Sequence, residues 1–125
     1  MDVNQISGVV VDAAMKVHSA LGPGLLEKTY ELCLMHELRK RGLNVASQVG
    51  LPVVYDNVNM NIGYRIDLIV EDSVIVEVKA IEAIAPIHKA QLLTYLKLSE
   101  KRFGLLINFN VLHLKDGIKR VVNGF

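Results

Sequence analysis

The stretch YRIDLIVEDSVIVEVK, residues 64–79, decides the fold. Two apolar runs, 66–70 and 74–78, flank a polar break at 71–73. The runs are rich in β-branched residues and the break is typical of a turn, so the pattern predicts a β-hairpin. Both predicted strands nevertheless contain ionisable residues, which are seldom buried without partners.

Three charged residues of this hairpin need a common explanation. With the loop at 71–73, Asp67 lies opposite Glu77, and Arg65 lies opposite Lys79. Opposed side chains are roughly 4.5–5.5 Å apart at Cβ, where like charges destabilise the pair. One interpretation is a divalent cation held by Asp67 and Glu77, with Lys79 beside it. The other is a Lys79–Asp67 ion pair on a solvated face with Glu77 exposed, and the hairpin alone leaves both open.

Bulk properties predict one domain over residues 1–125 with a sizeable core. The chain is 51% hydrophobic and 22% charged, which excludes disorder over most of its length. No apolar run approaches the ~20 residues of a membrane span, and the start does not resemble a signal peptide. The single cysteine, Cys33, excludes an internal disulfide and a cysteine-based zinc site, so we expect a cytoplasmic protein with no membrane association. The net charge of +1 lacks the basic excess that is typical of strong nucleic-acid-binding proteins.

Before the hairpin, apolar spacing predicts a helix over 3–21, ended by Gly22-Pro23-Gly24. A second helix is expected over about 25–41. Short β-like segments follow, and we predict strands over the ranges 45–49, 53–55 and 60–70.

After the hairpin, whose second strand we extend to 80, Pro86 opens a predicted helix that runs to about residue 100. Its expected core face consists of Ala90, Leu93, Leu96 and the aliphatic stem of Lys97. A buried strand over 103–109 follows, and the last predicted element is a terminal hairpin over 112–122 that turns at Asp116-Gly117.

The strand–helix–strand order after the hairpin implies a right-handed crossover between parallel strands. The predicted sheet is therefore mixed, with the hairpin near its centre and helices on its faces. This is an α/β layered architecture.

The hairpin residues suit a hard cation. Mg²⁺ prefers oxygen ligands and typically uses one or two carboxylates plus waters and phosphate oxygens. Asp67 and Glu77 would supply the carboxylates, and the backbone carbonyl of Val78 is a further candidate ligand. Lys79 could orient or deprotonate a water, or stabilise charge that develops on a phosphate.

Polar residues elsewhere in the chain also sit awkwardly in apolar elements. Glu27 lies at the start of the second predicted helix, where a carboxylate also favours the helix dipole. Glu31 lies four residues later, on the same helix face. Gln91 and Tyr95 are likewise four residues apart and share a face of the third helix.

Taken together, these segments resemble the PD-(D/E)XK nuclease superfamily. Gly24-Leu-Leu-Glu27-Lys-Thr-Tyr30 matches the GxxExxY signature of one small-protein branch of it. The other matching segments are Gly63-Tyr-Arg-Ile-Asp67-Leu, Val76-Glu-Val-Lys79-Ala, Gln91-Leu-Leu-Thr-Tyr95-Leu, Leu106-Ile-Asn-Phe-Asn110 and Lys115-Asp-Gly-Ile-Lys119-Arg. The residue before Asp67 is Ile66 and not the proline of the superfamily name, but the proline carries no chemistry.

The resemblance implies the αβββαβ nuclease core, a central mixed sheet flanked by helices. It implies that Asp67 and Glu77 bind metal and that Lys79 is the catalytic lysine. Glu27 would complete the site, and Gln91 and Tyr95 would border it and contact substrate. The implied cofactor is Mg²⁺, with Mn²⁺ as a substitute.

The function indicated in this way is hydrolysis of phosphodiester bonds in nucleic acid, with DNA expected, by metal-activated water attack. Candidate residues for contact with the nucleic-acid backbone are Arg65, Lys89 and Lys97. The alternative is a non-catalytic nucleic-acid- or protein-binding module that retains the nuclease fold. A third function, hydrolysis of a small phosphate ester, has no support in the sequence. A homodimer would pair two sites for double-strand cutting, a monomer would favour nicking, and the sequence leaves both open.

Overall fold

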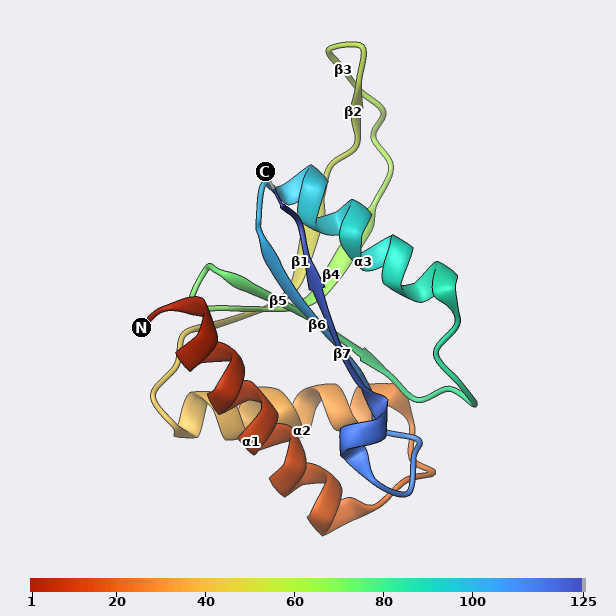
Figure 1. Ribbon diagram of the computed structural model, residues 1–125. Helices are drawn as coiled ribbons and strands as arrows, with labels where there is room; N and C mark the ends of the chain where they lie inside the picture. Colours follow the sequence, from red (N-terminus) through yellow and green to blue (C-terminus); the bar gives the residue numbers. More distant parts are fainter. Residues whose placement is uncertain (125) are drawn as a thin grey trace.

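A computed structural model describes residues 1–124 (Figure 1). Its elements, in chain order, are α1 (Val3–Leu21), α2 (Glu27–Lys40), β1 (Val45–Leu51), β2 (Val54–Tyr55), β3 (Val58–Asn59), β4 (Tyr64–Val70), β5 (Val74–Lys79), α3 (Pro86–Ser99), β6 (Phe103–Asn108), the 3-10 helix η1 (Leu114–Gly117) and β7 (Ile118–Val122). No helix in this range has the length and hydropathy needed to cross a membrane.

The main sheet is mixed and has the strand order β1-β4-β5-β6-β7. Strand β5 lies at its centre and pairs with β6 in parallel, through the crossover formed by α3. The other neighbours in the sheet are antiparallel. The predicted α/β architecture, with the hairpin β4–β5 near the centre and helices on both faces, is confirmed.

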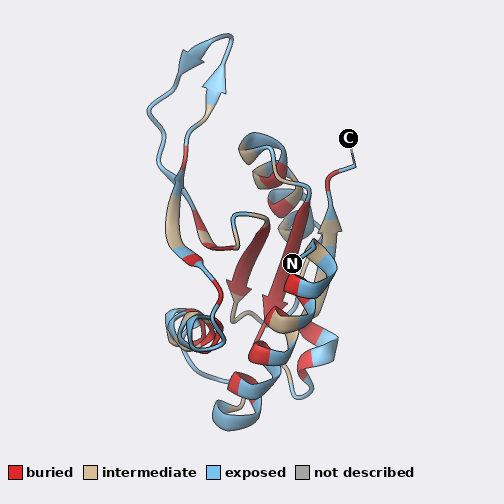
Figure 2. Cartoon of the chain, turned by 90° about the vertical axis from the view of Figure 1, so that its left-hand side faces the viewer, coloured by how far each residue is buried: buried red, intermediate tan, exposed pale blue. Residues whose placement is uncertain are grey.

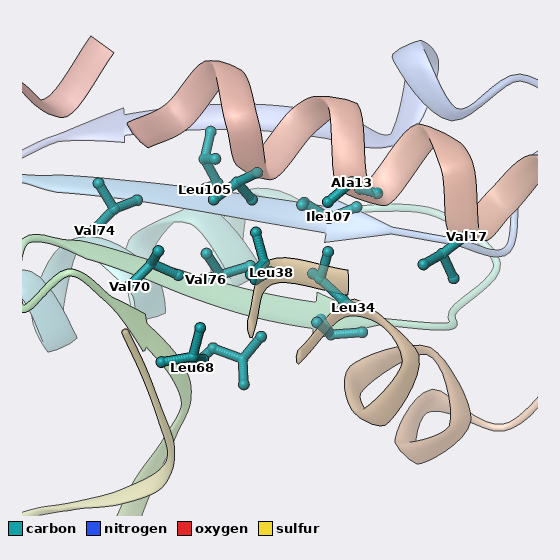
Figure 3. Packing of buried hydrophobic residues seen from close by; sticks show 14 of the residues in the cluster. Ala13, Val17, Leu34, Leu38, Leu68, Val70, Val74, Val76, Leu105 and Ile107 are labelled. Atoms are coloured by element: carbon teal, nitrogen blue, oxygen red, sulfur yellow. The ribbon is translucent and has the colours of Figure 1, made fainter. Parts of the chain in front are cut away.

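The two faces of the sheet carry separate apolar clusters. Helices α1 and α2 cover one face, where residues such as Ala13, Leu34 and Val76 pack together (Figure 3). Helix α3 covers the other face, where Leu92 and Leu96 pack against Ile75. The central strands β5 and β6 are therefore buried along almost their whole length (Figure 2). Removal of this apolar surface from water is the main stabilising term for the layered arrangement.

The predicted core face of the third helix is right for Leu96 and wrong for its other members. The buried residues of α3 are Leu92 and Leu96, whereas Ala90 and Lys97 are exposed and Leu93 is only partly buried. The reason lies in β6. A Cβ atom on Gly104 would be 3.0 Å from Leu92 Cδ1, so the missing side chain lets Leu92 settle directly on the strand.

The predicted strand over 60–70 is too long. Strands β2 and β3 form a small separate sheet that projects from the body as an arm (Figure 1). The strand is interrupted because Asn61 adopts a left-handed backbone with φ 54°. Its backbone N–H donates to the side chain of Asn59 over 2.9 Å, a local turn that competes with strand pairing.

The predicted terminal hairpin over 112–122 is also wrong. Residues 114–117 form η1, and the following strand β7 pairs antiparallel with β6 along the edge of the main sheet. Pairing with β7 satisfies the backbone groups on the second side of β6, which a self-contained terminal hairpin would have left at an edge. Gly117 ends η1 in contact with the end of β6.

Replacing Gly117 with alanine should destabilise the protein. The new Cβ atom would overlap the backbone carbonyl oxygen of Asn108, which belongs to β6 and cannot rotate away. We expect the free energy of unfolding to fall by about 1–3 kcal/mol in urea denaturation. Gly8→Ala is the matched control, because a Cβ there meets nothing within 4 Å and lies inside helix α1. That control should be neutral or stabilising. An unchanged midpoint for Gly117→Ala would contradict the packing described.

Candidate functional site

The hairpin β4–β5 has the predicted register. Val70 pairs with Val74, and the ladder continues to Leu68 and Val76. The loop turns at Glu71 and Asp72, both with φ 51°. At the end away from the loop, the last paired residues are Leu68 and Val76. Asp67 and Glu77 are the next residues beyond this pair.

Asp67 takes the place of a backbone acceptor where the two strands part. Its Oδ2 accepts a hydrogen bond of 2.9 Å from the backbone N–H of Val78. The carboxylate is therefore fixed against β5 and remains only partly buried. Because the N–H and C=O of one strand residue point to the same neighbouring strand, we expect the Val78 carbonyl to face this edge too.

Glu77 is a buried carboxyl group, and one of its oxygens lacks a hydrogen-bond partner within residues 1–124. The residue is 5% exposed, and its Oε1 has no hydrogen-bond partner among residues 1–124. Burial raises its pKa to about 9, assisted by the hydrogen bond and negative charge of Asp67, while the charge of Lys79 acts in the opposite direction. The alternative of an exposed Glu77 beside a Lys79–Asp67 ion pair is wrong, since burial of Glu77 excludes it.

Glu27 reaches the same edge of β5 from helix α2. Its Oε2 accepts a hydrogen bond of 3.2 Å from the backbone N–H of Ala80. The N–H groups of residues 78 and 80 point the same way and lie about 6–7 Å apart. The carboxylates of Glu27 and Asp67 therefore lie one after the other along this edge, on either side of residue 79.

The loop before α2 explains how Glu27 is placed. Gly24 has φ 98°, a backbone conformation that favours glycine. The Tyr30 hydroxyl donates to the Gly22 carbonyl over 2.6 Å and accepts from Leu25 N–H over 3.0 Å. The Tyr30 ring stacks on Phe109, with centroids 4.7 Å apart. In this chain the tyrosine of the GxxExxY segment holds the loop, and the glutamate faces β5.

Helix α3 brings Tyr95 toward the carboxyl groups from another element. Burial, and then the nearby charges of Glu77, Tyr64 and Asp67, raise the pKa of Tyr95. Its ring lies 6.4 Å from that of Tyr64. Gln91, four residues earlier on α3, is exposed.

The predicted nucleic-acid contacts lie at the surface. Lys89 and Lys97 are exposed on α3. Arg65 is exposed on β4, where its guanidinium donates to the backbone carbonyl of Gln48 over 3.2 Å. The structure thus gathers Glu27, Asp67, Glu77 and Tyr95 around the end of β5, and leaves Gln91 and these three cations on the outside. The functional roles of all these residues remain predictions.

Two residues that were not among the predicted site residues, Glu31 and Gln48, also lie in this region. Glu31 is 4% exposed, and its Oε2 accepts 2.8 Å and 3.1 Å hydrogen bonds from Gln48 Nε2 and Lys28 Nζ. Gln48 Nε2 also lies 3.4 Å from Asp67 Oδ1. The shared helix face of Glu27 and Glu31 was a usable signal for Glu31. Gln48 carries no such signal, because a polar residue in a strand does not indicate by its sequence position which residue of the neighbouring strand it contacts.

The donor set fits a hard cation of the Mg²⁺ class. Residues 1–124 contain no group of three or more His, Cys, Asp and Glu side chains placed to hold a metal together. The chain would therefore contribute the carboxylates of Asp67 and Glu77 and the Val78 carbonyl, with other ligands from water or substrate. The orphaned Oε1 of Glu77 supports this interpretation, because a cation would supply the missing partner.

The Glu77 carboxyl should make the stability of the metal-free protein depend on pH. Its folded-state pKa of about 9 lies above the ordinary 4.5, so its contribution is complete below about pH 4.5 and is lost as pH rises toward 9. Relative to Glu77→Gln, the wild type in EDTA should therefore lose stability across this window. Thermal unfolding of both proteins from pH 5 to 9 measures the difference. Parallel curves would contradict the raised pKa.

Comparison with known proteins bears on the family of the chain. A family model described as the PD-(D/E)XK nuclease superfamily matches residues 4–121. The searches of curated proteins and of solved structures returned no match. The family match spans nearly the whole chain, from α1 to the last strand, and includes every element that contributes to the end of β5. The chain therefore belongs to the PD-(D/E)XK nuclease superfamily.

Proposed function

We propose that this chain acts as a single-domain, Mg²⁺-dependent nuclease of the GxxExxY branch, with Mn²⁺ as a substitute cofactor. It would hydrolyse phosphodiester bonds in nucleic acid, with DNA as the expected substrate. The observation that carries the proposal is the buried Glu77, whose Oε1 lacks a partner within residues 1–124, next to Asp67 in a chain of this superfamily.

Asp67, Glu77 and the Val78 carbonyl would hold the cation. When bound, it would lower the pKa of a water and polarise the phosphate to be cleaved. The Val78 N–H already orients the Asp67 carboxylate. Because a carboxylate has about four lone-pair sites, Asp67 keeps some of them for a metal ligand bond. Glu77 would give up its proton on binding, because its raised pKa comes from burial and from the neighbouring Asp67, and a bound cation would offset both by stabilising the ionised carboxylate.

Lys79 would act on the proton or on the phosphate charge. Its charge is close enough to oppose the raised pKa of Glu77, and no ion pair formed within residues 1–124 engages it. An ammonium group that is partly buried and not committed to a carboxylate can stabilise negative charge in a transition state. As an ammonium it can also donate a hydrogen bond that orients the attacking water, and only as the neutral amine, after losing its own proton, could it take a proton from that water.

The remaining predicted residues would orient water and substrate. Glu27 would orient a water at the Ala80 end of the site, since its carboxylate accepts one hydrogen bond there and is otherwise exposed. Tyr95 has a raised pKa, so its phenol stays protonated and can donate a hydrogen bond to a phosphate oxygen. Gln91, exposed one turn earlier on α3, would contact the substrate farther out.

Nucleic acid would be held by local cations. The net charge of +1 gives little general attraction to a phosphate backbone. Arg65, Lys89 and Lys97 are exposed on the elements that carry Asp67 and Tyr95, so they are the candidates for phosphate contacts.

A second candidate function is a binding module without catalysis, and the arm favours it. Val54, Tyr55 and Val58 are 56%, 72% and 55% exposed on β2 and β3, so the arm presents apolar side chains to solvent. Such a surface suits a protein partner, including a second copy in a homodimer. Metal binding at Asp67 without cleavage of any nucleic acid would favour this function.

Replacing Lys79 with alanine should abolish most of the nuclease activity. Loss of a positioned proton-transfer or charge-stabilising group typically lowers the rate about 10²–10⁴-fold. We would measure cleavage of single-stranded, duplex and branched DNA with Mg²⁺ or Mn²⁺.

Lys101→Ala is the control for this measurement. Lys101 pairs with Asp72 at the opposite end of the sheet, and Asp72 is 93% exposed at its side chain, so its loss should cost little stability. Lys101→Ala should retain wild-type rates. Equal cleavage by Lys79→Ala and the wild type, or cleavage that EDTA does not suppress, would refute the proposed mechanism.

The double substitution Lys89→Gln and Lys97→Gln should weaken substrate binding without slowing the chemical step. Both side chains are exposed on α3. We expect KM to rise with kcat unchanged, and the salt dependence of binding to decrease by about one for each phosphate that the protein no longer neutralises. KM measured over a series of NaCl concentrations tests this. The same salt slope in the double variant would exclude these lysines from the interface.

A further inference from the structure

Gln48 has an unusual backbone at a position opposite Asp67. Its φ is 51°, in the left-handed region that non-glycine residues seldom occupy. In the β1–β4 register, Ser47 pairs with Leu68 and Val49 pairs with Ile66, which puts residues 48 and 67 face to face. Strained backbone of this kind persists only where the surrounding structure imposes it.

The distortion also interrupts the alternation of both strands. On β1, Val45 packs in the cluster under α1 and α2, whereas Val49 packs against the cluster under α3. On β4, Leu68 belongs to the first cluster and Ile66 to the second. Residues an even number apart should share a face of a regular sheet. The change of face therefore takes place in both strands between these positions, at residues 48 and 67.

The side chain of Gln48 uses this position to join two carboxylates. Its Nε2 donates to Glu31 Oε2 over 2.8 Å and to Asp67 Oδ1 over 3.4 Å. An amide nitrogen has two hydrogens and can serve both acceptors at once. With a carboxylate on either side, only the nitrogen end of the amide can face them.

Glu31 anchors this bridge to helix α2. It is 4% exposed, and Lys28 Nζ lies 3.1 Å from the same Oε2. The backbone carbonyl of Gln48 is held as well, by the Arg65 guanidinium at 3.2 Å. Helix α2 thus fixes the side chain of Gln48, and strand β4 fixes its backbone carbonyl. Through its Nε2 contact, the fixed Gln48 in turn restricts the orientation of the Asp67 carboxylate.

We propose that Gln48 is a positioning residue that orients the Asp67 carboxylate for metal binding, with Glu31 as its anchor. The inference rests on the proposed function, because it concerns the same metal site. Asp67 then has a donor on each oxygen, Val78 N–H on Oδ2 and Gln48 Nε2 on Oδ1, so the carboxylate plane cannot turn freely. Partners of this kind fix the orientation of a ligand without touching the metal.

Calorimetric titration of the full chain with Mn²⁺ tests the proposal. Gln48→Gly removes the amide and suits the left-handed backbone, so the melting temperature should be unchanged or higher. Its Kd for Mn²⁺ should rise about 10-fold or more, as for other residues that orient metal ligands. Gln48→Asn also tolerates this backbone but is one methylene too short to join both carboxylates, so it should weaken binding too. Glu31→Gln should weaken binding because the charged anchor is removed.

Asn61→Gly is the matched control, since Asn61 has a similar φ of 54° but lies at the base of the arm. It should bind Mn²⁺ like the wild type. If Gln48→Gly folds and binds within about twofold of the wild type, the positioning role is refuted while the metal site stands. If Gln48→Gly does not fold, Gln48→Asn decides by the same criterion. Absence of Mn²⁺ binding that depends on Asp67, measured with Asp67→Asn, would overturn the proposed metal site and this inference together.

Discussion

The carboxyl group of Glu77 lies in the central strand of the sheet, where a charge has almost no access to water. Within residues 1–124, its Oε1 has no partner, and its pKa of about 9 expresses the cost of ionising it beside Asp67. A buried carboxyl without compensation is unfavourable, and its replacement by an apolar residue would usually be neutral or stabilising. The rest of the site is organised around this one group: β4 parts from β5 beside it, the carboxylate of Asp67 bonds to β5 there, and Tyr95 is close enough for its pKa to respond to the Glu77 charge.

The fold supplies the rigidity that such a group requires. Strand β5 has neighbours on both sides and apolar layers on both faces, so its end is fixed by most of the core. Two features bring other elements to that end. Tyr30 ties down the loop before α2 and places Glu27 at Ala80, and Gly104 lets α3 settle closely on β6. Residues from distant parts of the chain therefore meet through packing and through one anchored loop, the segment before α2.

What the sequence could predict follows from how local each signal is. The register of β4–β5 and the bounds of α1 depend on alternation, turn residues and Gly22, so they could be predicted. The buried face of α3 could not, because it depends on a gap at Gly104 in a strand that follows the helix. The break at Asn61 and the edge pairing of β7 arose from competition among backbone partners. Asp67 and Glu77 were visible as charges in apolar strands, whereas Gln48 was hidden because its backbone conformation leaves no mark in sequence.

The two unfavourable features of the region lie in β5 and β1, the strands on either side of β4, and both neighbour the carboxylate of Asp67 on β4. Glu77 is an ionisable group in the core, and Gln48 is a non-glycine residue with φ 51°; both have Asp67 as a neighbour. A chain selected only for stability would be expected to lose both, since each has a simple replacement that removes its cost. Local rules are broken most often where function requires it. A cation at Asp67 would relieve the first cost directly, because positive charge stabilises the ionised form of Glu77. The same cation would benefit from the strained backbone of Gln48, because the Asp67 carboxylate that Gln48 orients loses less freedom on binding.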